Sequence, residues 1–331
     1  MKLRKIAYVL ICCSIITMFL GCTSPSSAYA QKSFYCMGKS VEIKIDPQYS
    51  NTKTVFKGCS KKLDQLEGAL SNQNIGSDIW KFNEYETVAL QSNYSVDIIE
   101  LALEINELYP VFDITKAPLY DFWDKCQENG TVPSLKEVSS VRNAVGSEKL
   151  SLVNKTISKK SPDVKIDLSE IIDGYIADML IDYLKSCNVS YGMVSVGNCV
   201  AVFGELPLGA AFKIGVKNPT NPSQLIGYIY LEEGAVFVAN DYDEFYTIGG
   251  KKYSRYISLS DGYPVSHSVH SVIVVSDSGA VANALAASIF IMQGGFQDVY
   301  KNQDFEFECM TIGDNGIKMS DGIVENFEYI N

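Results

Sequence analysis

The sequence predicts an α+β fold in which helices pack on a sheet rich in antiparallel strands. Residues 52–187 contain long helical patterns, and after residue 190 the pattern changes to short runs of Val, Ile and Tyr broken by Gly, Asn and Pro. Such runs are typical of strands joined by turns, and this mixture of elements favours an α+β architecture. The chain has 331 residues, 47% of them apolar, which is enough for one large core. We expect residues 33–331 to form a single bilobed domain.

The N-terminal segment predicts export and attachment to a membrane. Three basic residues precede the apolar run 6–20, which is too short for a comfortable membrane span, and Gly-Cys follows. A bacterial lipoprotein signal ends in this way, so we expect residues 1–21 to be a signal peptide removed before Cys22. Acyl chains on Cys22 would then anchor the protein at the extracytoplasmic face of the cell membrane, with residues 22–32 as a tether. The alternative is an ordinary signal peptide that happens to be followed by a cysteine.

Charge and cysteine spacing exclude several classes of function. The formal net charge is −11, which argues against a nucleic-acid partner, because phosphates require a basic surface. The six cysteines beyond Cys22 show no C-x-x-C spacing, so neither a zinc site nor a thioredoxin-like pair is supported. They are expected either to form disulfides or to be buried thiols.

The elements expected along the domain begin with a strand. Val41, Ile43 and Ile45 alternate with charged residues, which predicts a half-buried strand. Apolar residues recur at three- and four-residue steps through residues 52–70, which predicts a helix with one buried stripe. Further helices are expected at 95–109, 118–123, 169–187 and 279–292, with a strand-like segment at 164–167. Later strands are expected at 191–203, 211–217, 225–232, 235–240 and 271–276.

Two polar clusters are candidates for a site. Asp113 and Thr115 interrupt an apolar stretch just before Pro118, where a helix start can present backbone N–H groups to a ligand. Helix capping is the alternative role for this pair. Asp167, Glu170 and Asp173 are spaced three apart at the start of the helix expected at 169–187, with Ser169 as a plausible N-cap. Their carboxylates could hold a divalent cation, or could simply complement the helix dipole.

Other catalytic signatures are missing from the sequence. The only histidines, His267 and His270, are expected on opposite faces of a strand start, so a metal pair is not predicted. No G-x-S-x-G, H-E-x-x-H, Walker-type or G-x-G-x-x-G motif occurs. Serine hydrolases, zincins, P-loop enzymes and simple Rossmann folds therefore lose support.

Taken in order, segments from Phe34 to Gly294 resemble the FAD:protein FMN transferase family, the ApbE-like proteins. The matching motifs are Phe34-Tyr-Cys-Met-Gly38, the spacing of Ser71, Ser77 and Asn83, Phe112-Asp-Ile-Thr115, Asp167-Leu-Ser169 and Gly174-Tyr175. The resemblance implies an ApbE-like mixed fold with a flavin cleft between two lobes. It also implies Mg²⁺-dependent transfer of FMN from FAD to a threonine of a partner protein.

The same resemblance implies which residues of this chain form the site. Contacts with FAD would come from Met37, Val111, Phe112, Asp113, Asp167, Asp173, Gly197 and Ile257. The metal positions would be Glu170, Asn283 and Ala287.

Departures from the family pattern concentrate in this site. The lysine of the family's A-K-G is Asp173 here, and the two histidines before Ile257 are absent. In the last helix, the Asp and Thr that ligate Mg²⁺ in the family are replaced by Asn283 and Ala287. A hard cation such as Mg²⁺ loses most of its attraction to these two positions, although the carboxylate of Glu170 could restore some charge.

Three functional hypotheses follow. The first is an active flavinyltransferase with a rearranged site. The second is a flavin-binding or partner-binding lipoprotein without transfer activity, and the third is a purely structural interaction protein.

Overall fold

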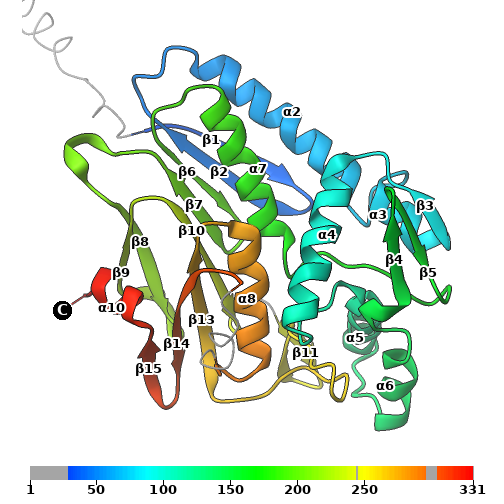
Figure 1. The fold of residues 1–331 in the computed structure, drawn as a ribbon. Helices are drawn as coiled ribbons and strands as arrows, with labels where there is room; N and C mark the ends of the chain where they lie inside the picture. The colour runs from blue at the N-terminus through cyan, green and yellow to red at the C-terminus, as the bar shows by residue number, and fades with distance from the viewer. Residues whose placement is uncertain (1–28, 244, 296–303, 331) are drawn as a thin grey trace, which may run out of the picture.

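A computed structural model describes residues 29–243, 245–295 and 304–330. Their main element is an antiparallel sheet of eight strands in the order β1-β2-β6-β7-β10-β13-β14-β15 (Figure 1). The predicted α+β class with an antiparallel-rich sheet is confirmed. The strands are β1 (Ala30–Cys36), β2 (Lys39–Ile45), β6 (Gly192–Val196), β7 (Cys199–Phe203), β10 (Gly234–Asn240), β13 (Val269–Ser276), β14 (Phe307–Gly313) and β15 (Gly316–Met319).

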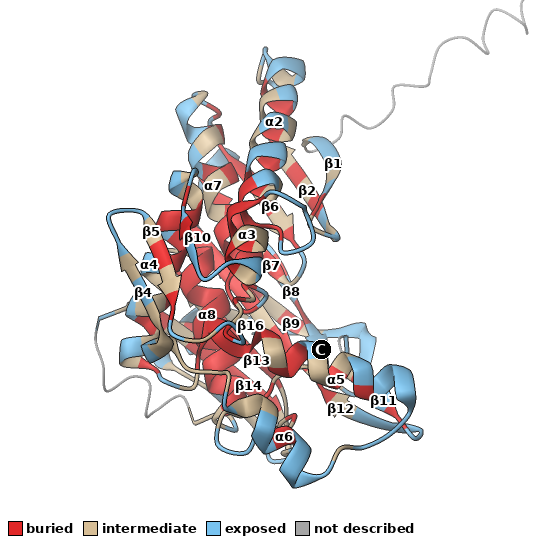
Figure 2. Ribbon diagram, turned by 90° about the vertical axis from the view of Figure 1, so that its right-hand side faces the viewer, coloured by how far each residue is buried: buried red, intermediate tan, exposed pale blue. Residues whose placement is uncertain are grey.

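Helices cover one face of this sheet (Figure 1). They are α2 (Thr52–Leu70), α7 (Ile172–Ser186) and α8 (Gly279–Ile291), with α4 (Asn93–Leu108) beside them. Every residue of α8 is buried, as expected for a helix in which only Asn283 and Ser288 are polar (Figure 2). Helices α7 and α8 cross closely, since a Cβ atom on Gly174 would overlap the backbone of Gly279. This crossing places the start of α7 directly against α8.

A smaller sheet packs against the opposite face. Its strand order is β16-β9-β8, formed by β8 (Phe212–Asn218), β9 (Asn221–Leu231) and β16 (Phe327–Tyr329). Aliphatic side chains of both sheets, including Ile214, Val236 and Ile273, form a second core between them. The short helix α10 (Asp321–Asn326) contacts β9 and β14.

A third core surrounds the fully buried Trp123. It joins α5 (Ala117–Asn129) and α6 (Leu135–Arg142) to the hairpin of β11 (Phe245–Ile248) and β12 (Lys251–Ser254). The remaining elements are α3 (Asp78–Glu84), a small sheet of β3 (Thr87–Ala89), β5 (Thr156–Lys159) and β4 (Leu150–Val153), and 3-10 helices at Ile114–Lys116, Ser147–Lys149 and Pro207–Gly209.

Most expected elements are present. The helix predicted at 52–70 is α2 with the same bounds, and its buried residues include the predicted apolar stripe. The strand predicted at 191–203 is instead two strands, β6 and β7, because a tight turn at Gly197 and Asn198 divides it. That residues 33–331 form one bilobed domain stays a prediction.

The expectations around residue 167 were wrong in two details. Residues 164–167 form no strand, because the Asn83 side chain bonds both backbone groups of Ile166, at 2.7 Å to N and 3.0 Å to O. The following helix begins at Ile172, and Ser169 does not cap it. The Ser169 amide instead donates to Asp167 Oδ1 at 2.8 Å, which forms a turn before the helix.

The expected signal peptide and Cys22 lie outside the described residues. Within the described ranges, no helix has the length and apolar character needed to cross a membrane. The six cysteines of that part of the chain are free thiols, and all except Cys187 are buried.

Candidate functional site

A cavity of about 270 Å³, lined by both polar and apolar residues, brings three of the predicted flavin residues together. Met37 comes from the β1–β2 turn, Asp167 from the loop before α7, and Asp173 from the first turn of α7. Met37 and Gly38 have φ values of 47° and 75°, so the two-residue turn uses left-handed backbone, for which glycine is favoured. We call this cavity the flavin cleft, after the residues that the sequence predicts to contact FAD.

Gly197 lies against Asp173 but does not itself line the flavin cleft. It sits in the β6–β7 turn with φ of 52°, and a Cβ atom there would overlap the carboxylate of Asp173. Lys39, the first residue of β2, places its Nζ 3.9 Å from Asp173 Oδ2. Lys39 therefore provides positive charge from β2 beside the α7 position where the family has its own lysine.

The Phe112–Thr115 junction lies next to the Asp167 loop. The Asp167 amide donates to the Ile114 carbonyl at 2.8 Å, which connects the two segments. Asp113 Oδ1 accepts from the amide and hydroxyl of Thr115 at 2.7 and 2.6 Å, and Oδ2 accepts from the Ser147 amide at 3.0 Å. In this structure Asp113 therefore caps the 3-10 helix Ile114–Lys116, the alternative role expected from the sequence.

The other predicted flavin residues do not line this cavity. Phe112 is fully buried, and its carbonyl accepts from Asn106 Nδ2 at 2.6 Å. Val111, before it, is half-buried. Ile257 is also fully buried and belongs to the core around Trp123.

The predicted metal positions carry few suitable oxygen donors. Asn283 and Ala287 are both buried in α8, and Asn283 Oδ1 lies 3.4 Å from the Gly174 amide, which donates to it. Ala287 offers no side-chain ligand. Among the described residues, no group of three or more His, Cys, Asp or Glu side chains is placed to hold a metal ion. Mg²⁺ is usually held by one or two carboxylates together with waters and substrate phosphates, and Asn283 and Ala287 supply no carboxylate, so this donor set does not fit it.

Glu170 is held by a buried ion pair. Lys116 Nζ lies 2.7 and 3.0 Å from its two carboxylate oxygens, and the Tyr120 hydroxyl donates to Oε1 at 2.5 Å. Burial, followed by the charge of Glu170, raises the pKa of Tyr120 well above its usual value. Both oxygens of Glu170 thus already have strong partners, which leaves little capacity for a cation.

Three important residues escaped the sequence-based prediction. Lys39 and Lys116 pair with Asp173 and Glu170, and the signal for Lys116 was a lysine inside an otherwise apolar stretch. The third is Asp178, which follows Gly174-Tyr175 on α7. Its carboxylate accepts from Ser278 Oγ at 2.8 Å and from the amides of Gly279 and Ala280 at 2.7 and 3.0 Å, so it caps α8. Burial raises the pKa of Asp178 despite these hydrogen bonds.

The two histidines have separate partners. His267 Nε2 lies 2.8 Å from the Phe290 carbonyl oxygen. His270 Nδ1 lies 2.8 Å from Asp241 Oδ2, and its Nε2 lies 3.2 Å from Asp314 Oδ1. These hydrogen bonds, that to Asp241 first, raise the pKa of His270.

Comparison with known proteins gives a consistent result. The ApbE family model matches residues 37–310. An FAD:protein FMN transferase from Vibrio cholerae is 27% identical over 293 residues, which cover 86% of this chain and 87% of that protein. The FAD:protein FMN transferase of Buchnera aphidicola is 30% identical over 267 residues, covering 77% of this chain and 78% of the relative.

Solved structures show the same similarity. The crystal structure of the ApbE protein from Thermotoga maritima matches with a TM-score of 0.82 and 26% identity, covering 90% of this chain and 99% of that one. The flavin transferase ApbE from Vibrio cholerae matches with a TM-score of 0.77 and 25% identity over the same shares. The family match and the fold therefore define a protein of the flavin transferase class.

The chain belongs to the ApbE family, the FAD:protein FMN transferases. Members of this family use FAD as substrate and transfer FMN from it to a partner protein.

Proposed function

We propose that this chain binds FAD in the flavin cleft and transfers FMN to a threonine of a partner protein far more slowly than a relative with an intact metal site. The observation that supports FAD binding is the convergence of Met37, Asp167 and Asp173 on one cavity. These residues come from three separate segments, each of which matches a family motif.

The charges in the cleft favour weak binding of the FAD pyrophosphate. Asp173 introduces an anion where the family has a lysine, and the Lys39 ammonium lies 3.9 Å from it. This pair adds no net positive charge, so the pyrophosphate gains less attraction than a lone lysine would provide. We expect FAD to bind mainly through its flavin and adenosine groups, and Asp173→Asn to increase its affinity.

A slow transfer rate is expected because the predicted metal positions lack free charged ligands. Divalent ions accelerate such reactions in general by neutralising charge on phosphoryl oxygens. Asn283 and Ala287 cannot supply a charged ligand, and Glu170 is committed to Lys116.

Calorimetric titration with Mg²⁺, combined with an FMN transfer assay, tests this proposal. Asn283→Asp with Ala287→Thr restores two oxygen ligands on one helix face and should raise Mg²⁺ affinity. An exposed Asn on the same protein, Asn326→Asp, is a control for added charge. Tight Mg²⁺ binding and rapid FMN transfer by the natural sequence would show that the metal site is intact.

FAD binding without any transfer, even in the double variant, would support the alternative of a flavin-binding lipoprotein without catalysis. The observation that favours this alternative is the pairing of Glu170 with Lys116, which engages the carboxylate of Glu170 that could have compensated for the lost ligands. A protein that binds neither FAD nor flavin would refute both possibilities.

We also propose that the mature protein is anchored through lipid on Cys22 and acts on an exported partner. The support is the Gly-Cys that ends the apolar N-terminal run. Cys22→Ser should release the protein from the membrane fraction or leave its signal uncleaved. Processed wild-type protein that lacks both lipid and Cys22 would contradict this.

A further inference from the structure

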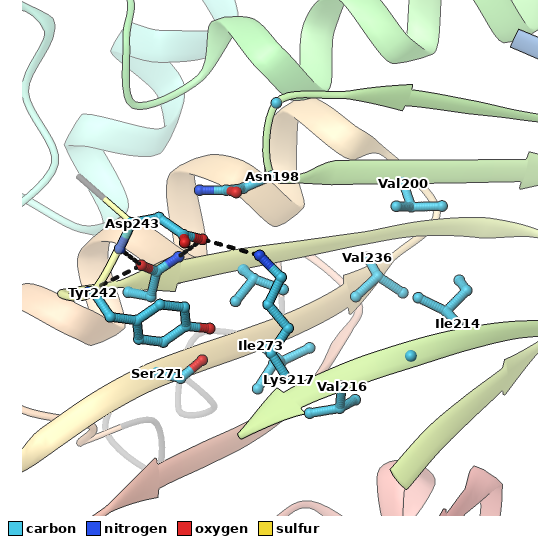
Figure 3. A pocket seen from close by; sticks show the side chains of 14 residues that line it. Asn198, Val200, Ile214, Val216, Lys217, Val236, Tyr242, Asp243, Ser271 and Ile273 are labelled. Carbon is cyan, nitrogen blue, oxygen red and sulfur yellow. Dashed lines mark hydrogen bonds and ion pairs between the residues drawn. The ribbon is translucent and has the colours of Figure 1, made fainter. Parts of the chain in front are cut away.

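A groove on the other side of the main sheet is distinct from the flavin cleft. It has a volume of about 160 Å³ and lies between the eight-stranded sheet and β8 (Figure 3). On β10, Val236 and Val238 line the groove, whereas the alternating residues Ala235 and Phe237 pack towards the helices. One part of the groove is aliphatic, lined by Val200, Val236, Val238, Ile273, Ile214 and Val216. Its other part is polar, lined by Asn198, Lys217, Asn240, Tyr242, Asp243 and Ser271.

The edge of β8 forms one border of this groove. β8 pairs with β9 on one side, and no other strand of the described ranges pairs with its second edge. Gly215 lines the groove although it has no side chain, so the β8 backbone itself is accessible there. An open strand edge presents N–H and C=O groups that can pair with another extended chain.

We propose that this groove docks an extended segment of the acceptor protein as an additional strand on β8. The inference rests on the proposed function and adds the surface that recognises the acceptor. A small molecule would use only the aliphatic cavity, whereas an extended segment also satisfies the backbone groups of the edge. Its alternate side chains point to one face, so one of them enters the cavity. The cavity is about the size of an apolar cavity that accepts a benzene ring, which suits one aliphatic side chain.

The position of the groove relative to the flavin cleft supports an acceptor rather than an unrelated partner. Gly197 lines the groove, and on the other side of its turn it contacts Asp173 of the flavin cleft. At this end Lys217 Nζ lies 3.4 Å from Asp243 Oδ2, close to Asn198 (Figure 3). A segment that runs along β8 therefore reaches the Gly197 turn, and the other side of this turn contacts Asp173 at the proposed FAD site.

The docking can be measured without any transfer reaction. The probe is a protein domain that the Vibrio cholerae relative flavinylates, together with a synthetic peptide of its acceptor segment. Val238→Phe fills the groove and should weaken probe binding at least tenfold. Val275→Phe is the matched control, because Val275 lies on the same sheet face and in the same core but does not line the groove. Affinity for FAD should be the same in both variants and the wild type.

A second measurement uses the wild-type protein, so it does not depend on a variant that folds. Two peptides carry backbone N-methyl groups on opposite alternating positions. Because only one edge of an added strand pairs with β8, one peptide should lose binding and the other should retain it. Hydrogen exchange of the amides of residues 212–218 should slow when the unmethylated probe binds.

Every other outcome overturns either the docking site or the proposed function. FAD binding without probe binding, or equal binding of the two methylated peptides, overturns the docking site while leaving the proposed function intact. Absence of FAD binding overturns the proposed function first. Sedimentation that shows self-association through β8, with probe binding unchanged by Val238→Phe, would assign the edge to a second copy of this chain instead.

Discussion

Removing either charge of the Lys116–Glu170 pair should strongly destabilise the protein. The two side chains are 1% and 9% exposed and lie 2.7 Å apart, so each charge depends on the other for compensation. Breaking a buried pair by removing one partner costs about 3–5 kcal/mol in other proteins. Glu170→Gln also weakens the acceptor of the Tyr120 hydroxyl. We therefore expect Glu170→Gln and Lys116→Met each to lower the free energy of unfolding by about 4 kcal/mol.

Replacing the whole group together should cost far less. In Lys116→Met with Glu170→Leu and Tyr120→Phe, no buried charge or hydroxyl remains without a partner, so we expect a loss of less than about 2 kcal/mol. Guanidinium unfolding of the single and combined variants measures the coupling directly. A single Glu170→Gln variant that loses less than about 1 kcal/mol while its Mg²⁺ affinity falls would identify Glu170 as a metal ligand instead.

Three further predictions concern other parts of the site. Gly197→Ala places a methyl group against the Asp173 carboxylate, at a position with left-handed backbone. The affinity for FAD should therefore fall, and the protein should be destabilised. An unchanged melting temperature and an unchanged FAD affinity would contradict this contact. Asp178→Asn removes the charge that accepts three hydrogen bonds at the start of α8. It should lower the free energy of unfolding in urea by about 1–3 kcal/mol. An unchanged free energy of unfolding would show that the cap is dispensable. The pKa of His270 is raised above 6.5, chiefly by Asp241, so its stabilising contribution is complete below pH 6.5 and disappears as the pH rises through the raised value. His270→Gln should flatten this pH dependence, and an unchanged slope would exclude the pair as its cause.

Local pattern was sufficient for the elements that bury a continuous apolar stripe. The stripe of α2 repeats through five turns without interruption, so its bounds follow from the spacing of the apolar residues. The short strands of the β11–β12 hairpin carry no such pattern, and their position depends on packing against Trp123. Residues 164–167 look like a strand in the sequence, but a single side chain, Asn83, satisfies the backbone of Ile166 from 83 positions away. A pairing of that kind has no local signal.

The residues of the candidate site were likewise predictable only in part. Family motifs identified Asp167, Asp173 and Gly197, and the structure places them around one cleft or its border. The partners of the charged residues could not be predicted. Lys39 and Asp173 are more than a hundred residues apart, and only the pairing of β2 with β6 brings the lysine to the start of α7.

The loss of metal ligands is confined to side chains, and the backbone that would present them remains in place. Gly174 and Gly279 still allow α7 and α8 to cross at backbone contact, and Asp178 still fixes the first turn of α8. Asn283 consequently faces the Gly174 amide at 3.4 Å, in a position that an aspartate could occupy without moving either helix. If the whole α7–α8 crossing had been free to change, larger residues would be expected at Gly174 and Gly279. Such residues would separate the two helices. Because the crossing is intact, two substitutions should be enough to recover metal binding, whereas the charge of Asp173 remains a separate obstacle to the pyrophosphate.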